Sequence, residues 1–186
     1  ATRDAESGRR LLREARITAS LEHPGIVPVH DAGTDPDGRP WYAMRLVRGR
    51  TLAASLDEVE GPGLRRRMLR HVLAAAEAVA FAHHAGVVHR DLKPANIQLG
   101  AFGETQVMDW GLARPVDGEA GWDEVLSGVG TLTGMGVILG TPAWMSPEQA
   151  AGRPVGPPSD VWSLGILLYE VLAGRRAYQA PTGEDV

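Results

Sequence analysis

The sequence predicts an α+β fold, and three observations lead to that prediction. Of the 186 residues, 44% are hydrophobic and 23% are charged, which is ordinary for a globular domain. Short strand-like segments alternate with longer segments of helical periodicity, and no internal repeat is visible. The polar stretch 89–96 contains a proline and is too short for a helix, so its side chains lie on a loop.

Charge and cysteine content exclude several classes of protein. The net charge of -4 argues against broad binding of nucleic acid or membrane surfaces, and the basic runs 9–10 and 65–67 fit solvated helix faces. With zero cysteines, disulfides and thiolate metal sites are excluded, which fits a reducing compartment. No apolar run approaches a membrane span and no signal peptide opens the chain. We expect a soluble segment without membrane or nucleic-acid contact.

The first predicted element is a helix over 7–21. The prediction is based on four apolar residues that recur at a spacing of three to four: Leu11, Leu12, Ala15 and Ala19. Pro24 marks the end of the segment. Glu14 flanks this stripe. It is either a surface carboxylate pairing with a neighbour such as Arg10 or a functional group.

Two strands, 26–31 and 41–47, follow the first helix and are joined by a Pro- and Gly-containing hairpin loop over 34–40. A short helix is predicted over 51–58 and a long one over 64–85, with Gly86 as its C-terminal cap. The apolar pattern predicts these inward residues on the long helix: Leu69, Val72, Leu73, Ala76, Val79 and Ala80.

The second half of the chain is predicted to contain a hairpin, a loop and a helix. The hairpin strands are 97–99 and 105–108, and the glycine-rich segment 114–140 is predicted to be a mobile loop. The last helix is expected to begin with Ser159 or Asp160 as its cap and to end at Gly174. Its expected buried residues are Val161, Leu164, Leu167, Leu168 and Val171.

The polar stretch His89–Asn96, followed by Asp109-Trp110-Gly111, contains the groups that phosphoryl transfer needs. That reaction uses a carboxylate as proton acceptor, a cation near the phosphoryl group and oxygen ligands for magnesium. Asp91 supplies the base and Lys93 the cation, and Asn96 with Asp109 supplies hard oxygen ligands. A lone aspartate in a loop is more often a turn former, but the combined spacing is unlike turn preference alone.

The order H-R-D-L-K-P-x-N followed by D-x-G resembles the catalytic and metal loops of protein kinases, in the eukaryotic-like serine/threonine branch found in bacteria. The resemblance implies a two-lobed kinase-like fold truncated at both ends. Residues 1–44 would be the remnant of the small lobe, 45–50 the hinge and 51–186 part of the large lobe. It also implies ATP and Mg²⁺ as cofactors, protein substrates with Ser or Thr acceptors, and a cytoplasmic location in a parent that a membrane span could anchor.

The resemblance assigns roles around the nucleotide. Glu14 matches the regulatory-helix glutamate that pairs with a lysine on the third strand, and that lysine is not in this sequence. Met44 would guard the rear of the nucleotide pocket, and main-chain groups of Arg45 and Val47 would read adenine. His89 would pack beneath the metal loop.

The resemblance also assigns regulatory positions. Trp110 replaces the usual phenylalanine before Gly111, so we expect the in-and-out motion of that motif to be altered rather than lost. Thr131 and Thr133 are candidate phosphorylation sites whose phosphate Arg90 could recruit, or else plain loop residues. The glycines of 128–130 and 134–136 do not have the spacing of a phosphate-binding loop.

The segment 140–148 resembles the substrate-seating segment of serine/threonine kinases, with Ser146 where alanine is usual. Thr141 matches the hydroxyl that bridges the base and its lysine, which implies Ser or Thr as acceptor. Glu148 would normally pair with an arginine outside this sequence. Asp160 is either a plain N-cap or the aspartate that braces the catalytic loop, and capping does not exclude bracing.

Three alternatives compete with a protein kinase. A pseudokinase-like scaffold would use the large lobe to bind partners, but it has no need for base and metal positions together. A small-molecule phosphotransferase of the same fold lacks the substrate segment around Thr141. A zinc site at His83, His84 and His89 lacks acidic or sulfur ligands at suitable spacing. As an incomplete catalytic domain, the segment alone is expected to have little activity.

Overall fold

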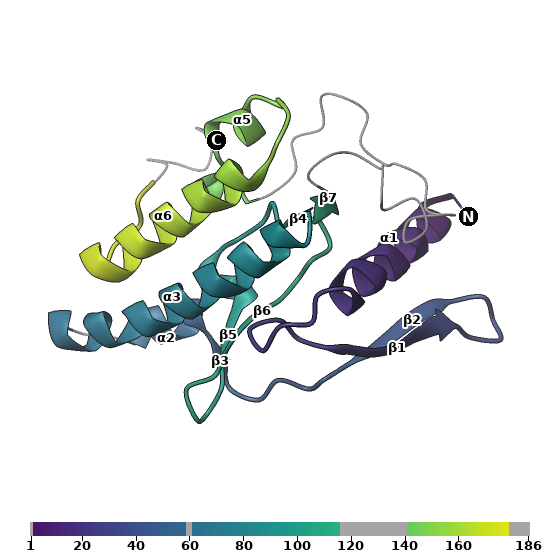
Figure 1. The fold of residues 1–186 in the computed structure, drawn as a ribbon, viewed down its shortest axis with the longest axis horizontal. Helices are drawn as coiled ribbons and strands as arrows, with labels where there is room; N and C mark the ends of the chain where they lie inside the picture. Colours follow the sequence, from purple (N-terminus) through teal and green to yellow (C-terminus); the bar gives the residue numbers. More distant parts are fainter. Residues whose placement is uncertain (1, 59–60, 116–140, 179–186) are drawn as a thin grey trace.

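The computed structural model describes residues 2–58, 61–115 and 141–178, and it confirms an α+β fold (Figure 1). The N-terminal part consists of helix α1 (Thr2–Ala19) and an antiparallel hairpin of β1 (Val29–Thr34) and β2 (Pro40–Met44). Helix α1 packs against this hairpin. This arrangement is the small β-containing part of the molecule.

The remaining part is mostly helical. Its elements, in chain order, are β3 (Arg50–Thr51), α2 (Leu52–Glu58), α3 (Pro62–His84), β4 (Val87–Val88), the 3-10 helix η1 (Pro94–Asn96), β5 (Ile97–Leu99), β6 (Thr105–Val107), β7 (Arg114–Pro115), the 3-10 helix η2 (Pro142–Trp144), α5 (Pro147–Ala150) and α6 (Pro157–Ala173). Helix α3 packs between α6 and β6 (Figure 1). None of the helices within the described ranges has both the length and the apolarity to cross a membrane.

Over the described ranges, the strands form three small sheets. β5 lies between β3 and β6 in one antiparallel sheet, with Ile97 opposite Val107 and Thr51 opposite Gln98. β1 pairs with β2, and β4 pairs with β7. The sheet β3-β5-β6 matters most for function, because the polar stretch precedes β5 and Asp109 follows β6.

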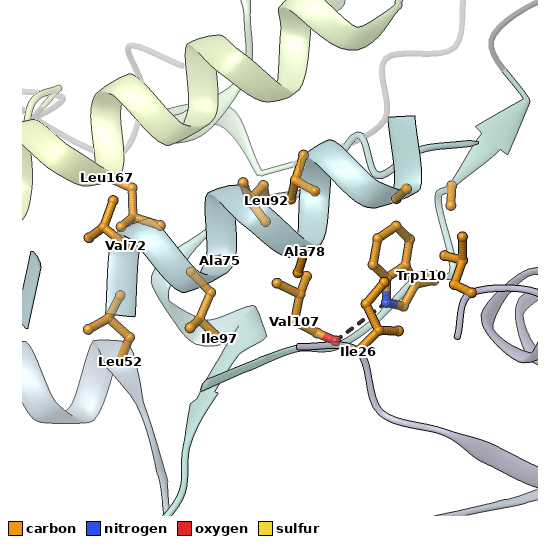
Figure 2. Packing of buried hydrophobic residues seen from close by; sticks show 14 of the residues in the cluster. Ile26, Leu52, Val72, Ala75, Ala78, Leu92, Ile97, Val107, Trp110 and Leu167 are labelled. Carbon is orange, nitrogen blue, oxygen red and sulfur yellow. Dashed lines mark hydrogen bonds between the residues drawn. The ribbon is translucent and has the colours of Figure 1, made fainter. Parts of the chain in front are cut away.

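A continuous hydrophobic core joins the two parts of the chain (Figure 2). Ile17 of α1, Ile26 and Trp110 belong to the same cluster as Leu167 of α6, and each is at most 2% exposed. A parallel bridge between Ile26 and Val107, with Val107 N–H donating to the Gly25 carbonyl at 2.7 Å, reinforces this junction. The end of β6 is therefore fixed to the N-terminal part by both packing and main-chain hydrogen bonds.

Between β2 and β3, the backbone at Gly49 passes very close to the backbone of Leu99 on β5. Gly49 has φ 133°, and a Cβ there would lie 1.9 Å from the Leu99 carbonyl oxygen. No side chain fits at that distance, so glycine is required for the crossing. Residues 45–50, the predicted hinge, include this point, and the division into 1–44, 45–50 and 51–186 stays a prediction.

The inward face of α3 differs from the sequence prediction. Val72 and Val79 are buried as expected, but Leu73 is 62% exposed and Ala80 is also exposed. The buried stripe instead consists of His71, Val72, Ala75, Ala78, Val79 and Ala82. The sequence did not predict this stripe for two reasons. It includes the polar His71, and the apolar pattern alone does not show which of the many alanines face inward.

Helix α6 also departs from expectation at its start and on one face. It begins at Pro157 with Gly156 as N-cap, so neither Ser159 nor Asp160 caps it. Leu167 and Val171 are buried, whereas Val161 is 60% and Leu168 is 41% exposed. The predicted burial of Val161 and Leu168 is wrong within the described residues, because α3 packs against the side of α6 that carries Leu167 and Val171. The end at Gly174, with φ 64°, is confirmed.

Smaller differences concern element boundaries. The first helix begins at Thr2 rather than residue 7, and the first strand begins at Val29 because Ile26 forms only an isolated bridge. Arg114 and Pro115 pair with β4 instead of starting a loop. The rest of the predicted loop, including Thr131 and Thr133, lies outside the described residues.

Candidate active site

Asp91, Lys93 and Thr141 form a closed triangle of hydrogen bonds. Lys93 Nζ donates to Asp91 Oδ2 and to Thr141 Oγ1, each at 2.7 Å, and the Thr141 hydroxyl donates to Asp91 Oδ1 at 2.9 Å. Lys93 is the only lysine in the sequence. The Asp91 side chain is 10% exposed, so both of its oxygens are oriented in a partly buried site. Residues 48 to 50 positions apart in sequence thus meet at one carboxylate.

Asn96 connects this triangle to the strand that precedes Asp109. Its Nδ2 donates to the Asp91 carbonyl at 2.9 Å, with a longer contact of 3.4 Å to Asp91 Oδ2. Its own carbonyl accepts from Met108 N–H at 2.9 Å. Because Met108 immediately precedes Asp109, this bond joins the main chain of Asn96 to the segment of the predicted metal-binding aspartate.

Asn96 and Asp109 fit a magnesium ion by the chemistry of their donors. The amide nitrogen of Asn96 is committed to Asp91, which leaves the amide oxygen as its ligand atom. Asp109 has φ 61° and an exposed side chain, although the neighbouring Trp110 is buried. Mg²⁺ commonly takes one or two protein oxygens and completes its shell with water and phosphate. A pair of hard oxygen donors is sufficient for that ion.

His89 lies beneath the metal segment, as predicted. It is fully buried, its ring lies 4.6 Å from the Trp110 ring, and its Nε2 bonds the Met108 carbonyl at 3.1 Å. Its Nδ1 accepts from Asp91 N–H at 3.3 Å, which assigns the proton to Nε2. The Trp110 indole N–H donates to the Val107 carbonyl at 3.4 Å (Figure 2). A phenylalanine at this position could not make that bond.

Asp160 braces the main chain of the polar stretch from α6. Its Oδ2 accepts from His89 N–H at 2.8 Å, and its Oδ1 accepts from Arg90 N–H at 2.9 Å. His83 Nε2 also lies 2.8 Å from Oδ2. Arg90 has φ 74°, a conformation that residues with a side chain seldom adopt, and Asp160 holds both amides around it. The N-cap alternative for Asp160 is wrong.

Ser146, where the family usually has alanine, caps the short helix α5. Its Oγ accepts from Gln149 N–H at 3.3 Å, and Gln149 Oε1 accepts from Ser146 N–H at 3.0 Å. This reciprocal pair is a capping box. Gln149 Nε2 in turn donates to the Arg90 carbonyl at 2.6 Å. Helix α5 is thereby attached to the polar stretch.

Glu148 has a polar partner within the described residues. The Ser159 hydroxyl donates to its Oε1, and this hydrogen bond is the main reason that the pKa of Glu148 is lowered. The expected partner of this glutamate was an arginine outside the sequence. The hydrogen bond from Ser159 links α5 to the start of α6, and the arginine pairing stays a prediction.

Arg90 is part of a group of three neighbouring arginines. Burial lowers its pKa, and the charges of Arg114 on β7 and Arg13 on α1 lower it further, while Asp160 acts in the opposite direction. The Arg90 Nε is buried and makes no hydrogen bond among the described atoms. A concentration of positive charge with an unsatisfied donor is suited to an anion.

The side of the site around Met44, Arg45 and Val47, where a nucleotide is predicted to bind and which we call the nucleotide side, is more open. Met44 at the end of β2 is 44% exposed, and it lines a cavity together with Glu14 and Asp109. Arg45 N–H donates to the Pro28 carbonyl at 3.1 Å, so only the carbonyl of Arg45 remains for adenine. Val47 is half-buried. The assignment of Met44, Arg45 and Val47 to nucleotide binding stays a prediction.

Glu14 faces the same cavity. Its Oε1 accepts a hydrogen bond from the Tyr42 hydroxyl at 3.1 Å. The pairing with Arg10 considered for this glutamate involves a side chain outside the described residues, so it stays a prediction. Gly111 lies between the carboxylates of Glu14 and Asp109, since a Cβ there would be 3.1 Å from Glu14 Oε2 and 3.2 Å from Asp109 Oδ1.

Comparison with known proteins decides the family. The protein kinase domain model matches residues 1–186. The chain belongs to the protein kinase domain family. The kinase-domain resemblance seen in the loop sequence therefore extends over the whole chain.

Curated relatives of this kinase domain are bacterial enzymes. The chain is 36% identical to serine/threonine-protein kinase PknD of Protochlamydia amoebophila, over 95% of the chain and 20% of that protein. It is 39% identical to PknB of Mycobacterium tuberculosis, over 92% of the chain and 26% of PknB, and 39% identical to PknA of the same species, over 94% and 39%. The kinase domain thus spans between a fifth and two fifths of the length of these relatives.

Sequence reasoning missed several residues that complete the kinase site. They are His83, Gln149, Tyr42, Arg13 and Arg114. Their partners lie on other elements, so no local pattern identified them. His83 was weighed only as a zinc ligand, and its bond to Asp160 assigns it a structural contact instead. The described residues contain no cluster of three His, Cys, Asp or Glu side chains that could hold a metal.

Proposed function

We propose that the protein containing this domain is an ATP-dependent protein serine/threonine kinase. The observation that carries the proposal is the triangle of Asp91, Lys93 and Thr141, attached through Asn96 to the segment of Asp109. These groups are the base, the cation and the two metal ligands that transfer of a γ-phosphoryl group requires. Protein substrates, ATP and a cytoplasmic site of action are part of the proposal.

The proposed reaction assigns one proton movement to Asp91. Its carboxylate accepts the proton of the attacking hydroxyl, as that oxygen forms a bond to the γ-phosphorus and the bond to the leaving oxygen of ADP breaks. Each carboxylate oxygen can accept more than one hydrogen bond, so the contacts from Thr141 and Lys93 orient Asp91 without saturating it. Lys93 stabilises the negative charge that develops near the hydroxyl.

Asn96 and Asp109 would hold Mg²⁺, and when bound this ion supplies positive charge next to the phosphate oxygens. The role of the chain is to keep the two oxygen donors in place. Asn96 is fixed by its bond to the Asp91 carbonyl, and Asp109 follows a strand whose end is bonded to Asn96 and to Gly25. Such preorganisation avoids rearrangement during the reaction.

Replacement of Asp91 tests this proposal. Asp91→Asn in the full-length protein keeps the shape of the side chain but removes the base, and we expect transfer of labelled phosphate to a protein substrate to fall by about 10²–10⁴-fold. Asp37→Asn, in the exposed β1–β2 loop, is the matched control and should retain wild-type rates. Wild-type rates in Asp91→Asn would contradict the proposed function.

A scaffold without catalysis is the competing function. A scaffold has no chemical need for a base whose two oxygens are both oriented by partners, and that observation favours an enzyme. Thermal shift of the full-length protein discriminates between them: a kinase is stabilised by ATP only when magnesium is present, whereas a scaffold is not. No magnesium-dependent stabilisation by ATP, together with no phosphate transfer, would favour the scaffold.

We also propose that a phosphate on Thr131 or Thr133 would bind Arg90, supported by the nearby charges of Arg13 and Arg114. In full-length protein, phosphatase treatment should then lower the activity several-fold in wild type but hardly at all in Arg90→Gln. Arg153→Gln, which removes an exposed arginine, should behave like wild type. An equal response of wild type and Arg90→Gln would exclude this regulation.

A further inference from the structure

Tyr42 is a polar residue on β2 that no motif of the sequence singled out. Its hydroxyl donates to Glu14 Oε1 at 3.1 Å and thereby joins the hairpin to α1. Tyr42 and Met44 are two positions apart on this strand, so their side chains lie on the same face of it. Both line the cavity that also contains Glu14 and Asp109. The hydroxyl is therefore directed toward the nucleotide side of the site and not toward solvent.

The second oxygen of Glu14 lies on the other side of the carboxylate. A Cβ added to Gly111 would meet Glu14 Oε2 at 3.1 Å and Asp109 Oδ1 at 3.2 Å, so these oxygens flank the same glycine. The cavity here has a volume of about 30 Å³, enough for about one water molecule. Oε1 is thus bonded to Tyr42, and Oε2 faces the segment of Asp109.

The electrostatic surroundings keep Tyr42 protonated. Burial raises the pKa of Tyr42 to about 12, with further increases from the charge of Glu14, the hydrogen bond to it and the charge of Asp109. The phenol consequently remains a hydrogen-bond donor throughout the physiological pH range. It supplies a neutral donor to one carboxylate without neutralising either of them.

We propose that Tyr42 is a positioning residue, which holds Glu14 by Oε1 so that Oε2 stays directed toward Asp109, on the side of the cavity where the nucleotide phosphates are predicted to bind. This inference rests on the proposed kinase function. Tyr42 acts through Glu14, and it neither contacts the reacting atoms nor takes part in proton transfer. The polar loop 89–96 is held by other residues, among them Thr141, Gln149 and Asp160.

A double-mutant cycle in the full-length protein tests this role. Tyr42→Phe removes only the hydroxyl, and we expect it to lower kcat/KM for ATP about three- to tenfold, mainly through KM, because the base and its partners are untouched. In a Glu14→Gln background, Tyr42→Phe should have almost no further effect, since the two residues act as a unit. Tyr169→Phe on α6, which removes the hydroxyl of a 38% exposed tyrosine, is the matched control and should not change the kinetics.

Several results would overturn this inference while leaving the kinase function intact. One is an unchanged kcat/KM in Tyr42→Phe, in a protein that Asp91→Asn inactivates. Another is an equal decrease in the wild-type and Glu14→Gln backgrounds, which would show that Tyr42 acts independently of Glu14. A fall in kcat alone would place Tyr42 in the chemical step and would also contradict a positioning role. An inactive wild-type protein would instead refute the kinase function, and this inference with it.

Discussion

The catalytic loop and the nucleotide side of the site are held in place in different ways. In the loop, the side chains of Asp91, Lys93 and Asn96 are bonded to one another, and α6 fixes the main chain through Asp160. On the nucleotide side, Met44 is 44% and Leu46 is 77% exposed. The main specific contacts there are Arg45 N–H to the Pro28 carbonyl and Tyr42 to Glu14.

This difference indicates where the chemical groups are preorganised. Asp91, Lys93 and Asn96, the proposed base, cation and metal ligand, are oriented by contacts within the helical part, so their geometry does not depend on a bound nucleotide. In the small β-containing part, Glu14 of α1 accepts a hydrogen bond from Tyr42 of β2. Substitutions in the loop support should therefore cost stability and activity together, whereas substitutions on the nucleotide side should mainly change nucleotide affinity.

The largest expected effect comes from breaking the loop support at Asp160. Asp160→Ala leaves the buried amides of His89 and Arg90, as well as His83, without their acceptor. Each buried unsatisfied group costs roughly 1–3 kcal/mol, so we expect a loss of about 3–5 kcal/mol in the free energy of unfolding. Urea denaturation measures this loss, and amide hydrogen exchange at His89 and Arg90 should accelerate.

Asp37→Ala is the matched control for this substitution. Its carboxylate pairs with Arg39 at 3.7 Å, and the two side chains are 71% and 78% exposed. Exposed ion pairs contribute little, so no measurable change in stability is expected. If Asp160→Ala were as stable as Asp37→Ala, the loop would not depend on α6, and the contrast between the two regions would fail.

Local motifs allowed much of the site to be predicted from the sequence. The triangle at Asp91 and the brace at Asp160 both correspond to residues singled out by spacing and resemblance. Contacts that depend on tertiary packing could not be predicted in this way. Gln149 bonds the Arg90 carbonyl across 59 positions, and Tyr42 reaches Glu14 across 28, with no local pattern marking either pair.

The same limit applies to the fold. The hairpin of β5 and β6 was predictable because turn residues separate two short apolar runs. The buried face of α3 was not, because alanines occur on several sides of this helix and its stripe includes His71. Trp110 was expected to alter the motion of its segment. Its indole N–H bond to the Val107 carbonyl is a contact that phenylalanine lacks, but the effect on motion stays a prediction.

A smaller effect is expected at His71, which supports the strand leading to Asp109. His71 is 3% exposed, its Nδ1 lies 2.6 Å from Thr105 Oγ1 on β6, and Arg70 Nε donates to its Nε2 at 3.1 Å. Because Nε2 accepts, the ring is neutral and Nδ1–H donates to Thr105. Burial, followed by the charge of Arg70, lowers the pKa of His71 below its usual 6.5.

The sign of the pH dependence follows from this lowered pKa. Below about pH 6.5 the unfolded state binds a proton at His71 that the folded state resists. The contribution of His71 to the free energy of unfolding is therefore fully present above this pH and declines as the pH falls toward the folded pKa.

The urea midpoint of unfolding, measured between pH 7.5 and 5.5, should show this decline in wild type. It should depend less on pH in His71→Asn, which keeps an N–H for Thr105. His30→Gln, on the exposed face of β1, should keep the wild-type slope. If the His71→Asn profile is as steep as wild type, another group causes the decline. A flatter profile would instead show that the helical part, despite its many hydrogen bonds, loses stability through the titration of His71 against strand β6.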